Sequence, residues 1–299
     1  MAAEAAVSGA GTRGSLYALD SGIRRRQMVD RVVTVVVTAC TLVSVALLVF
    51  ILGYVILRGA PAITPSFFFD RPLPYGEPGG GIGPAFLGSL IMLSIASAIG
   101  IPFGVLTGVY LAEIGTGRFP TVVRFAIDLL AGLPSIVVGM FIWALVVKHV
   151  LGQYAGFAGA LALSIIMIPI ITRTVEEILL LVPDSLREAS LALGIPRWKT
   201  ILFVVLPTAR AGLVTGVVLS LARAGGETAP LLLTALGNQF FSYNLMEPMA
   251  SLPVQIYSYA IGPYEDWHTK AWGGALVLIV TIGTLSFLAR LAIRGRRPV

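Results

Sequence analysis

The stretch from Arg187 to Pro207, REASLALGIPRWKTILFVVLP, is a polar segment between two long apolar blocks. Just before it, Asp184 and the serine that follows are suited to cap a helix that begins there. Gly194 tolerates a positive φ and Pro196 cannot continue a helix, so this helix is predicted to end at Gly194. Apolar residues then return at helical spacing as far as Pro207. The pattern predicts two short helices joined by a break, an elbow (residues 183–207) between two membrane spans.

The composition indicates an integral membrane protein. Of its 299 residues, 57% are hydrophobic and only 12% are charged, and the mean hydropathy is +0.90. Soluble domains carry about twice that charged fraction. The one cysteine, Cys40, lies in an apolar stretch, so no disulfide can form within the chain. Basic residues flank the apolar stretches without forming an aromatic-interleaved face, which argues against nucleic acid. We expect a single all-α, polytopic bundle.

Six apolar segments are long enough to cross the ~30 Å hydrocarbon core of a bilayer as helices. The first is too long for the apolar core of a signal peptide, which is ~7–15 residues. Pro102 predicts a kink in the second, and Pro134 a bend or break in the third. Glycines in the second segment favour close helix packing. The predicted spans are residues 32–57, 84–111, 125–147, 154–171, 211–236 and 271–291.

The segments outside the spans are short. Residues 1–31 are predicted to be a flexible basic tail, and residues 294–299 a second basic tail. Residues 58–83 are rich in Pro and Gly and predict an exposed loop. This loop, like the whole chain, lacks the phosphate-binding motif GxxxxGK[ST]. If ATP drives this protein, another chain has to bind it.

The distribution of Lys and Arg predicts the orientation in the membrane. With both termini inside, the inner segments carry 16 of these residues and the outer segments carry four. The elbow and both termini are therefore expected on the cytoplasmic side, and residues 58–83 outside.

The fifth span contains the sequence RAGGETAP, residues 223–230, with two charged residues at membrane depth. Such residues are costly in a bilayer and usually functional. Arg223 and Glu227 are four residues apart, so they share a helix face and can pair. Pro230 and the two glycines predict that the helix opens beside the pair, which is tolerated only within protein or along a wet cavity.

This pair suits a protonated oxyanion. The guanidinium of Arg223 is a planar donor matched to an oxyanion, and an ionised Glu227 can accept a hydrogen bond from protonated phosphate but not from sulfate, which carries no proton at neutral pH. The alternative is a self-neutralising pair that locks helices together. Arg173, near the end of the fourth span, is a candidate for a second cationic step, or else an ordinary interfacial charge. The predicted substrate path is thus Arg223, Glu227 and Arg173.

The elbow resembles the EAA loop of ABC importer permeases, in which EAA, three residues, Gly, nine residues and I-x-L-P follow one another. Ser190 replaces the second Ala and Val204 the Ile. The resemblance implies a coupling helix that sits in a cleft of an ATPase. An amphipathic helix lying on the bilayer is the alternative. The residues that the resemblance assigns to coupling are Glu188, Ala189, Ser190, Gly194, Leu206 and Pro207.

Residues 30–295 resemble the PstA-type permeases of phosphate ABC importers. The shared motifs are GGIGP at 80–84, LPSIVVG at 133–139, VPDSLREA at 182–189 and RAGGETAPLL at 223–232. The resemblance implies a type I ABC importer permease fold over residues 84–293 and alternating access. It also implies a PstC-like second permease, an ATPase dimer that binds ATP and Mg²⁺, and an extracytoplasmic phosphate-binding protein. It implies no cofactor on this chain.

Three other functions are weighed against this one. A permease for sulfate or molybdate is disfavoured by Glu227. A secondary transporter or channel would leave the elbow unexplained. An intramembrane enzyme needs a catalytic constellation, and the sequence shows neither a nucleophile–base pair nor a cluster of metal ligands.

Overall fold

The computed structural model describes residues 11–77 and 79–294, and within these ranges it is helical without any strand. The chain divides into two units between Tyr54 and Val55. Each unit is described by itself. The predicted tail residues 1–10 and 295–299 lie outside the described residues.

The first unit consists of helix α1 (Gly11–Gly59) as far as Tyr54. Where the sequence predicts a flexible tail up to residue 31, the described part from Gly11 is helical. The reason is that this stretch contains no proline and continues directly into the apolar span, so the helix propagates without a new nucleus. From residue 25 to 51 every side chain is exposed, including the whole apolar run.

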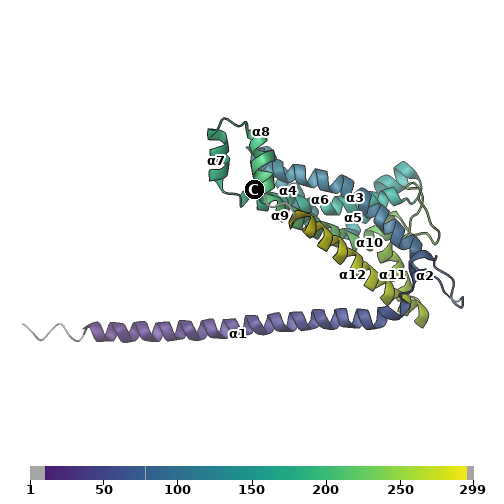
Figure 1. Cartoon of the computed structure of the whole chain (residues 1–299), viewed down its shortest axis with the longest axis horizontal. Coiled ribbons are helices and arrows are strands. Elements are labelled where there is room, and N and C mark those ends of the chain that lie inside the picture. The colour runs from purple at the N-terminus through teal and green to yellow at the C-terminus, as the bar shows by residue number, and fades with distance from the viewer. Residues whose placement is uncertain (1–10, 78, 295–299) are drawn as a thin grey trace, which may run out of the picture. The chain divides into compact units, whose positions relative to one another are not determined.

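The second unit is a bundle whose elbow lies at one end, while α2 and α11 lie at the other (Figure 1). Its helices alternate between long apolar ones and short connecting ones. In chain order they are η1 (Ala60–Ala62), α2 (Pro65–Phe69), α3 (Gly83–Val109), η2 (Tyr110–Ile114), α4 (Arg118–Gly132), α5 (Ser135–Ile142), η3 (Trp143–Leu151), α6 (Gly156–Leu180), α7 (Asp184–Ala192), α8 (Arg197–Thr200), η4 (Ile201–Val205), α9 (Leu206–Gly225), α10 (Ala229–Thr234), α11 (Leu252–Ala260) and α12 (Glu265–Arg294).

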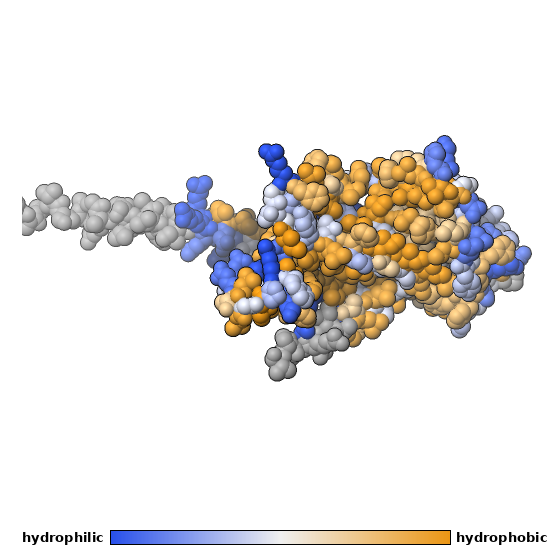
Figure 2. Space-filling model, turned by 90° about the horizontal axis from the view of Figure 1, so that it is seen from above, coloured by the Kyte–Doolittle hydropathy of each residue, from blue (hydrophilic) through white to orange (hydrophobic). Residues whose placement is uncertain are grey.

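The number of spans matches the prediction with one qualification, whereas the fifth, Arg197–Gly225, begins and ends earlier than the predicted 211–236. Five helices of the described residues are long and apolar enough to cross a membrane. The sixth is a broken pair, α4 followed by α5 and η3, bent by 102°. Pro134 stands in the break as the residue before α5, so the bend predicted there is confirmed. Figure 2 shows the corresponding apolar belt over the second unit, with polar residues toward its ends.

Helix α6 is the centre of the bundle, and α3 lies directly against it. The contact depends on a stripe of glycines on α3, as predicted. A Cβ added at Gly104 would come within 2.7 Å of the Cβ of Ile171, and one at Gly108 within 2.7 Å of the Cβ of Val175. The absence of side chains therefore brings the two backbones together, as in other membrane helix pairs.

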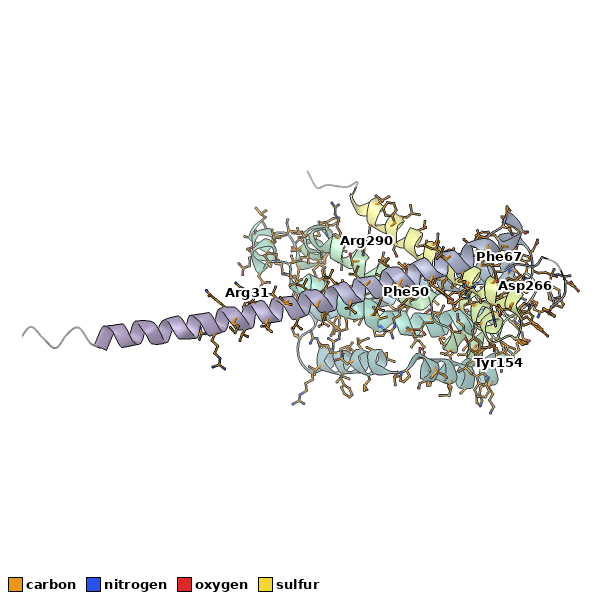
Figure 3. The ribbon with its side chains drawn as sticks, turned by 90° about the horizontal axis from the view of Figure 1, so that it is seen from below. Arg31, Phe50, Phe67, Tyr154, Asp266 and Arg290 are labelled. Carbon is orange, nitrogen blue, oxygen red and sulfur yellow. The ribbon has the colours of Figure 1, made fainter. Side chains whose placement is uncertain are left out.

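The predicted exposed loop 58–83 is partly folded. Phe67 on α2 is buried, in one cluster with Ile82 and Tyr259, and the hydroxyl of Tyr259 donates to the carbonyl of Gly81. The prediction of an exposed loop is wrong here because its aromatic residues cover α11 and α12. Figure 3 shows Phe67, Tyr154 and Asp266 gathered at this end and Arg290 toward the other.

Candidate functional site

The fifth span is broken where the sequence predicts it. Helix α9 ends at Gly225 and α10 begins at Ala229. Two hydrogen bonds that reach back three residues close the end of α9. The N–H of Gly226 donates to the carbonyl of Arg223, and the N–H of Glu227 donates to that of Ala224. Pro230 is buried in the first turn of α10, where its missing N–H costs nothing.

The break is held by the bent third span. A Cβ at Gly139 of α5 would lie 2.7 Å from the Cα of Pro230, so the two segments touch through backbone. The hydroxyl of Thr234 is buried and donates to the carbonyl of Pro230 over 2.7 Å, so this polar group is satisfied within α10. Two of the sequence motifs, LPSIVVG and RAGGETAP, therefore pack against each other.

Arg223 and Glu227 form a loose pair beside this break. The Nε of Arg223 lies 3.8 Å from Oε1 of Glu227, beyond hydrogen-bonding distance. The Arg223 side chain is 56% exposed, whereas that of Glu227 is 15% exposed. Among the described residues, no carboxylate other than Glu227 pairs with Arg223. The guanidinium is thus more than half exposed, with donor groups that no other carboxylate of the described residues occupies.

Arg173 is in a different situation, since two carboxylates hold it. Its Nε donates over 2.8 Å to Asp128 of α4, and its Nη1 over 3.2 Å to Glu176. Glu176 is buried and also accepts from Nε of Arg124 over 2.5 Å. Arg124 in turn donates to the carbonyl of Leu111. The four side chains balance in charge, so the structure does not present Arg173 as a free cation.

The two arginines of the predicted path lie at different depths. A Cβ at Gly216 of α9 would touch Thr174, so Gly216 is level with the residue after Arg173. Arg223 is seven residues further along α9, which corresponds to ~10 Å at 1.5 Å per residue. Arg223 is therefore nearer the α11 end and Arg173 nearer the elbow.

The elbow has the predicted two helices and the predicted turn. Helix α7 ends before Gly194, whose φ of +78° is the left-handed conformation that favours glycine. Two details differ. Asp184 makes no capping bond and instead pairs with Arg187 over 3.0 Å. The helix also does not stop at Pro207, because the π-helical turn η4 precedes it and Pro207 enters α9 in its first turn, where no N–H is needed.

The coupling residues fall into three groups. Glu188, Ala189 and Gly194 are exposed on the elbow. Ser190 is buried, and its hydroxyl lies 2.9 Å from that of Thr200, which ties α7 to α8. Leu206 and Pro207 begin α9 and carry the elbow into the fifth span. The serine that replaces the second Ala of the motif thus has a contact of its own.

Four acidic and basic partners were not identifiable from sequence: Glu113, Asp128, Glu176 and Arg124. Each is paired with a residue far away in the chain, such as Arg187 with Glu113 over 2.6 Å. The hydrogen bond to Glu113 raises the pKa of Arg187, which stays charged at any physiological pH. Within the described residues, no three or more His, Cys, Asp or Glu side chains are grouped to hold a metal ion.

Residues 100–297 match the family model described as "Binding-protein-dependent transport system inner membrane component". The phosphate transport system permease protein PstA of Pasteurella multocida is 45% identical over 82% of this chain and 87% of its own length. PstA 1 of Mycobacterium tuberculosis is 39% identical over 95% and 97%. The chain belongs to the PstA family of binding-protein-dependent permeases. It is accordingly a multi-pass membrane protein, and a transport component rather than an enzyme.

Solved structures confirm the fold of this PstA-family chain. A MetNI methionine ABC transporter in an inward-facing conformation superposes with a TM-score of 0.57 at 21% identity, over 73% of this chain and 95% of that one. A bacterial ABC transporter for alginate import gives 0.55 at 14% identity, over 85% and 95%. The fold is that of type I ABC importer permeases, and such a permease acts together with other ABC subunits.

Proposed function

We propose that this chain is a permease subunit of an ATP-driven importer of inorganic phosphate and forms half of its transmembrane pathway. The observation that carries the proposal is the loose Arg223–Glu227 pair at a helix break, in a chain of the PstA family. The curated relatives are phosphate transport permeases by name.

The chemistry of the pair fits phosphate. Arg223 offers a charged, planar set of N–H donors to an oxyanion. At 3.8 Å from Glu227, its Nε is not hydrogen-bonded to that carboxylate, so the guanidinium can turn toward a bound anion. The mostly buried carboxylate of Glu227 can only accept hydrogen bonds, so it accepts one from the O–H of HPO₄²⁻ or H₂PO₄⁻, whereas sulfate has no O–H to donate.

The exposure of Arg223 supports a partner on this face. A half-exposed arginine at membrane depth needs water or another protein surface around it. A PstC-like second permease supplies the other half of the path in this proposal.

ATP and Mg²⁺ bind to an ATPase dimer that docks on the elbow, and a phosphate-binding protein delivers phosphate from outside. Both termini lie on the cytoplasmic side, as the Lys and Arg distribution indicates.

The mechanism is alternating access without covalent chemistry on this chain. Closure of the ATPase dimer displaces the exposed Glu188–Gly194 surface of the elbow. Because α8 and η4 continue into α9, this displacement reaches the broken fifth span directly. The spans open outward, phosphate enters at Arg223, and ATP hydrolysis resets the elbow.

The test is uptake of ³²P-phosphate by the assembled complex in proteoliposomes with ATP inside. We expect uptake that needs hydrolysable ATP and that a tenfold excess of unlabelled phosphate, but not of sulfate or molybdate, suppresses. Suppression by sulfate or molybdate would favour the alternative of another oxyanion. Uptake without ATP would favour a secondary transporter. Glu227→Gln separates the oxyanion alternatives further, since an unchanged preference for phosphate contradicts the role given to that carboxylate.

A further inference from the structure

Glu113 is a buried carboxylate that the proposed mechanism leaves unused. It lies in η2, at the elbow end of the second span, and its side chain is 5% exposed. Arg187 of α7 donates to it with two nitrogens, from Nη2 over 2.6 Å and from Nε over 3.2 Å to each carboxylate oxygen. Arg197 of α8 donates to the backbone carbonyl of the same residue. Both helices of the elbow, α7 and α8, therefore donate hydrogen bonds to Glu113.

Arg187 also fastens α7 to the end of the fourth span. Its Nη1 donates to the carbonyl of Val182 over 2.6 Å, and its Nη2 to that of Leu179 over 2.8 Å. The guanidinium of Arg187, on the elbow, is thus hydrogen-bonded to the ends of both the second and the fourth span.

Few other contacts attach α7. Ser190 is the one buried residue among its nine, and that residue bonds to α8 rather than to a span. The apolar residues Leu191 and Leu193 point outward, exposed by 49% and 80%. The exposed leucines contribute little packing between α7 and the bundle, and the Arg187–Glu113 pair is the ion pair that joins α7 to the second span.

Glu113 belongs to a closely packed part of the bundle. Helix α3 leads directly into η2, and its glycine stripe packs backbone to backbone on α6. A force on Glu113 therefore moves α3 and α6 together. Helix α6 carries Arg173, and α9 with Arg223 packs against it.

We propose that the Arg187–Glu113 pair is the link through which displacement of α7 is transmitted to the α3–α6 body. The proposal rests on the proposed function, because it presupposes an ATPase that moves the elbow. Glu113 and Arg187 are positioning residues, since neither touches the substrate. A two-nitrogen bond between a guanidinium and a carboxylate fixes direction as well as distance, which a sliding apolar contact does not.

The test compares coupling in the assembled complex in proteoliposomes. Glu113→Gln keeps the shape of the side chain and removes its charge. We expect the ATPase rate to stay within about twofold of wild type while phosphate uptake per ATP hydrolysed falls at least tenfold. Arg187→Gln should give the same loss, and the double variant should be no worse than either single one, because the two act as a unit. Asp184→Asn is the matched control, since it removes the 88% exposed partner of the same arginine and should change neither quantity.

Three results overturn the link. The first is a wild-type ratio of uptake to hydrolysis in Glu113→Gln. The second is a parallel fall of uptake and ATPase activity, and the third is additive losses in the double variant; both of these indicate a general structural role. If Glu113→Gln does not assemble, Glu113→Asp replaces it, because it keeps the charge and withdraws the carboxylate by one methylene, with the same outcomes. A wild-type complex that carries no phosphate contradicts the proposed function instead, so the two failures are distinguishable.

Discussion

Gly108→Leu is expected to prevent the second and fourth spans from packing. Its Cβ would lie 2.7 Å from both Cβ and Cγ1 of Val175 and 2.8 Å from the carbonyl oxygen of Thr172, and the rest of the leucine has no room. Overpacking a well-packed core costs ~1–3 kcal/mol. Here a backbone-to-backbone contact is forced apart, so we expect the upper part of that range or more, and loss of the assembled complex on size-exclusion chromatography.

Gly283→Leu is the matched control for that prediction. It lies in α12, another spanning helix, and nothing is within 4 Å of a Cβ at this position. The thermal midpoint of the purified complex should then stay near that of wild type. A normal midpoint for Gly108→Leu would mean that the glycine stripe does not set the distance between α3 and α6.

Arg223→Gln is expected to remove most phosphate uptake while the complex still assembles and hydrolyses ATP. Hydrogen bonds to charged groups contribute ~1.5–3 kcal/mol, which corresponds to a loss of about 10–150-fold. Assembly should survive because the side chain is 56% exposed and its only ion pair, among the described residues, is the loose one to Glu227. The measurement is ³²P-phosphate uptake and ATPase activity in the same proteoliposomes.

Arg210→Gln serves as the control for this variant, since it removes an arginine from the same helix α9, 13 residues before Arg223 and so ~20 Å away from it along the helix. Its uptake should match wild type. Unimpaired uptake by Arg223→Gln would make the Arg223–Glu227 pair structural, and the phosphate assignment would then rest on family membership alone.

The parts of the structure that follow local rules could be predicted from sequence. Pro230 with two preceding glycines breaks the fifth span, Pro134 bends the third, and Gly194 takes the positive φ of the elbow turn. The glycines of the second span mark its close contact with α6. In each case one residue type restricts its own backbone or its nearest neighbour, and no distant partner is needed.

The charged contacts could not be predicted, because each depends on a distant residue. Arg173 is 45 residues from Asp128, and Arg187 is 74 from Glu113. The sequence therefore indicated Arg173 as a candidate cation on the substrate path, but it did not indicate that two carboxylates pair with Arg173. Pro207 was misleading for another reason. A proline usually ends a helix, yet here the π-helical turn η4 lets the helix pass through into α9.

The most direct test of the account is whether the break in the fifth span faces a phosphate path that opens alternately to the two sides. Gly226 stands in this break at a φ of −96°, and a Cβ there meets nothing closer than 3.8 Å, so Gly226→Cys fits. Cys40→Ser makes this chain cysteine-free, since Cys40 is its only native cysteine, and the complex with Cys40→Ser alone is the control for labelling elsewhere. In the assembled complex, a membrane-impermeant charged thiol reagent is added on one side at a time, with and without nucleotide and phosphate.

We predict modification from the outside when a non-hydrolysable ATP analogue holds the ATPase dimer closed, and modification from the cytoplasmic side without nucleotide. We also predict that modification is slower with phosphate present. A cysteine that does not react, or that reacts from one side regardless of nucleotide and phosphate, would contradict the account.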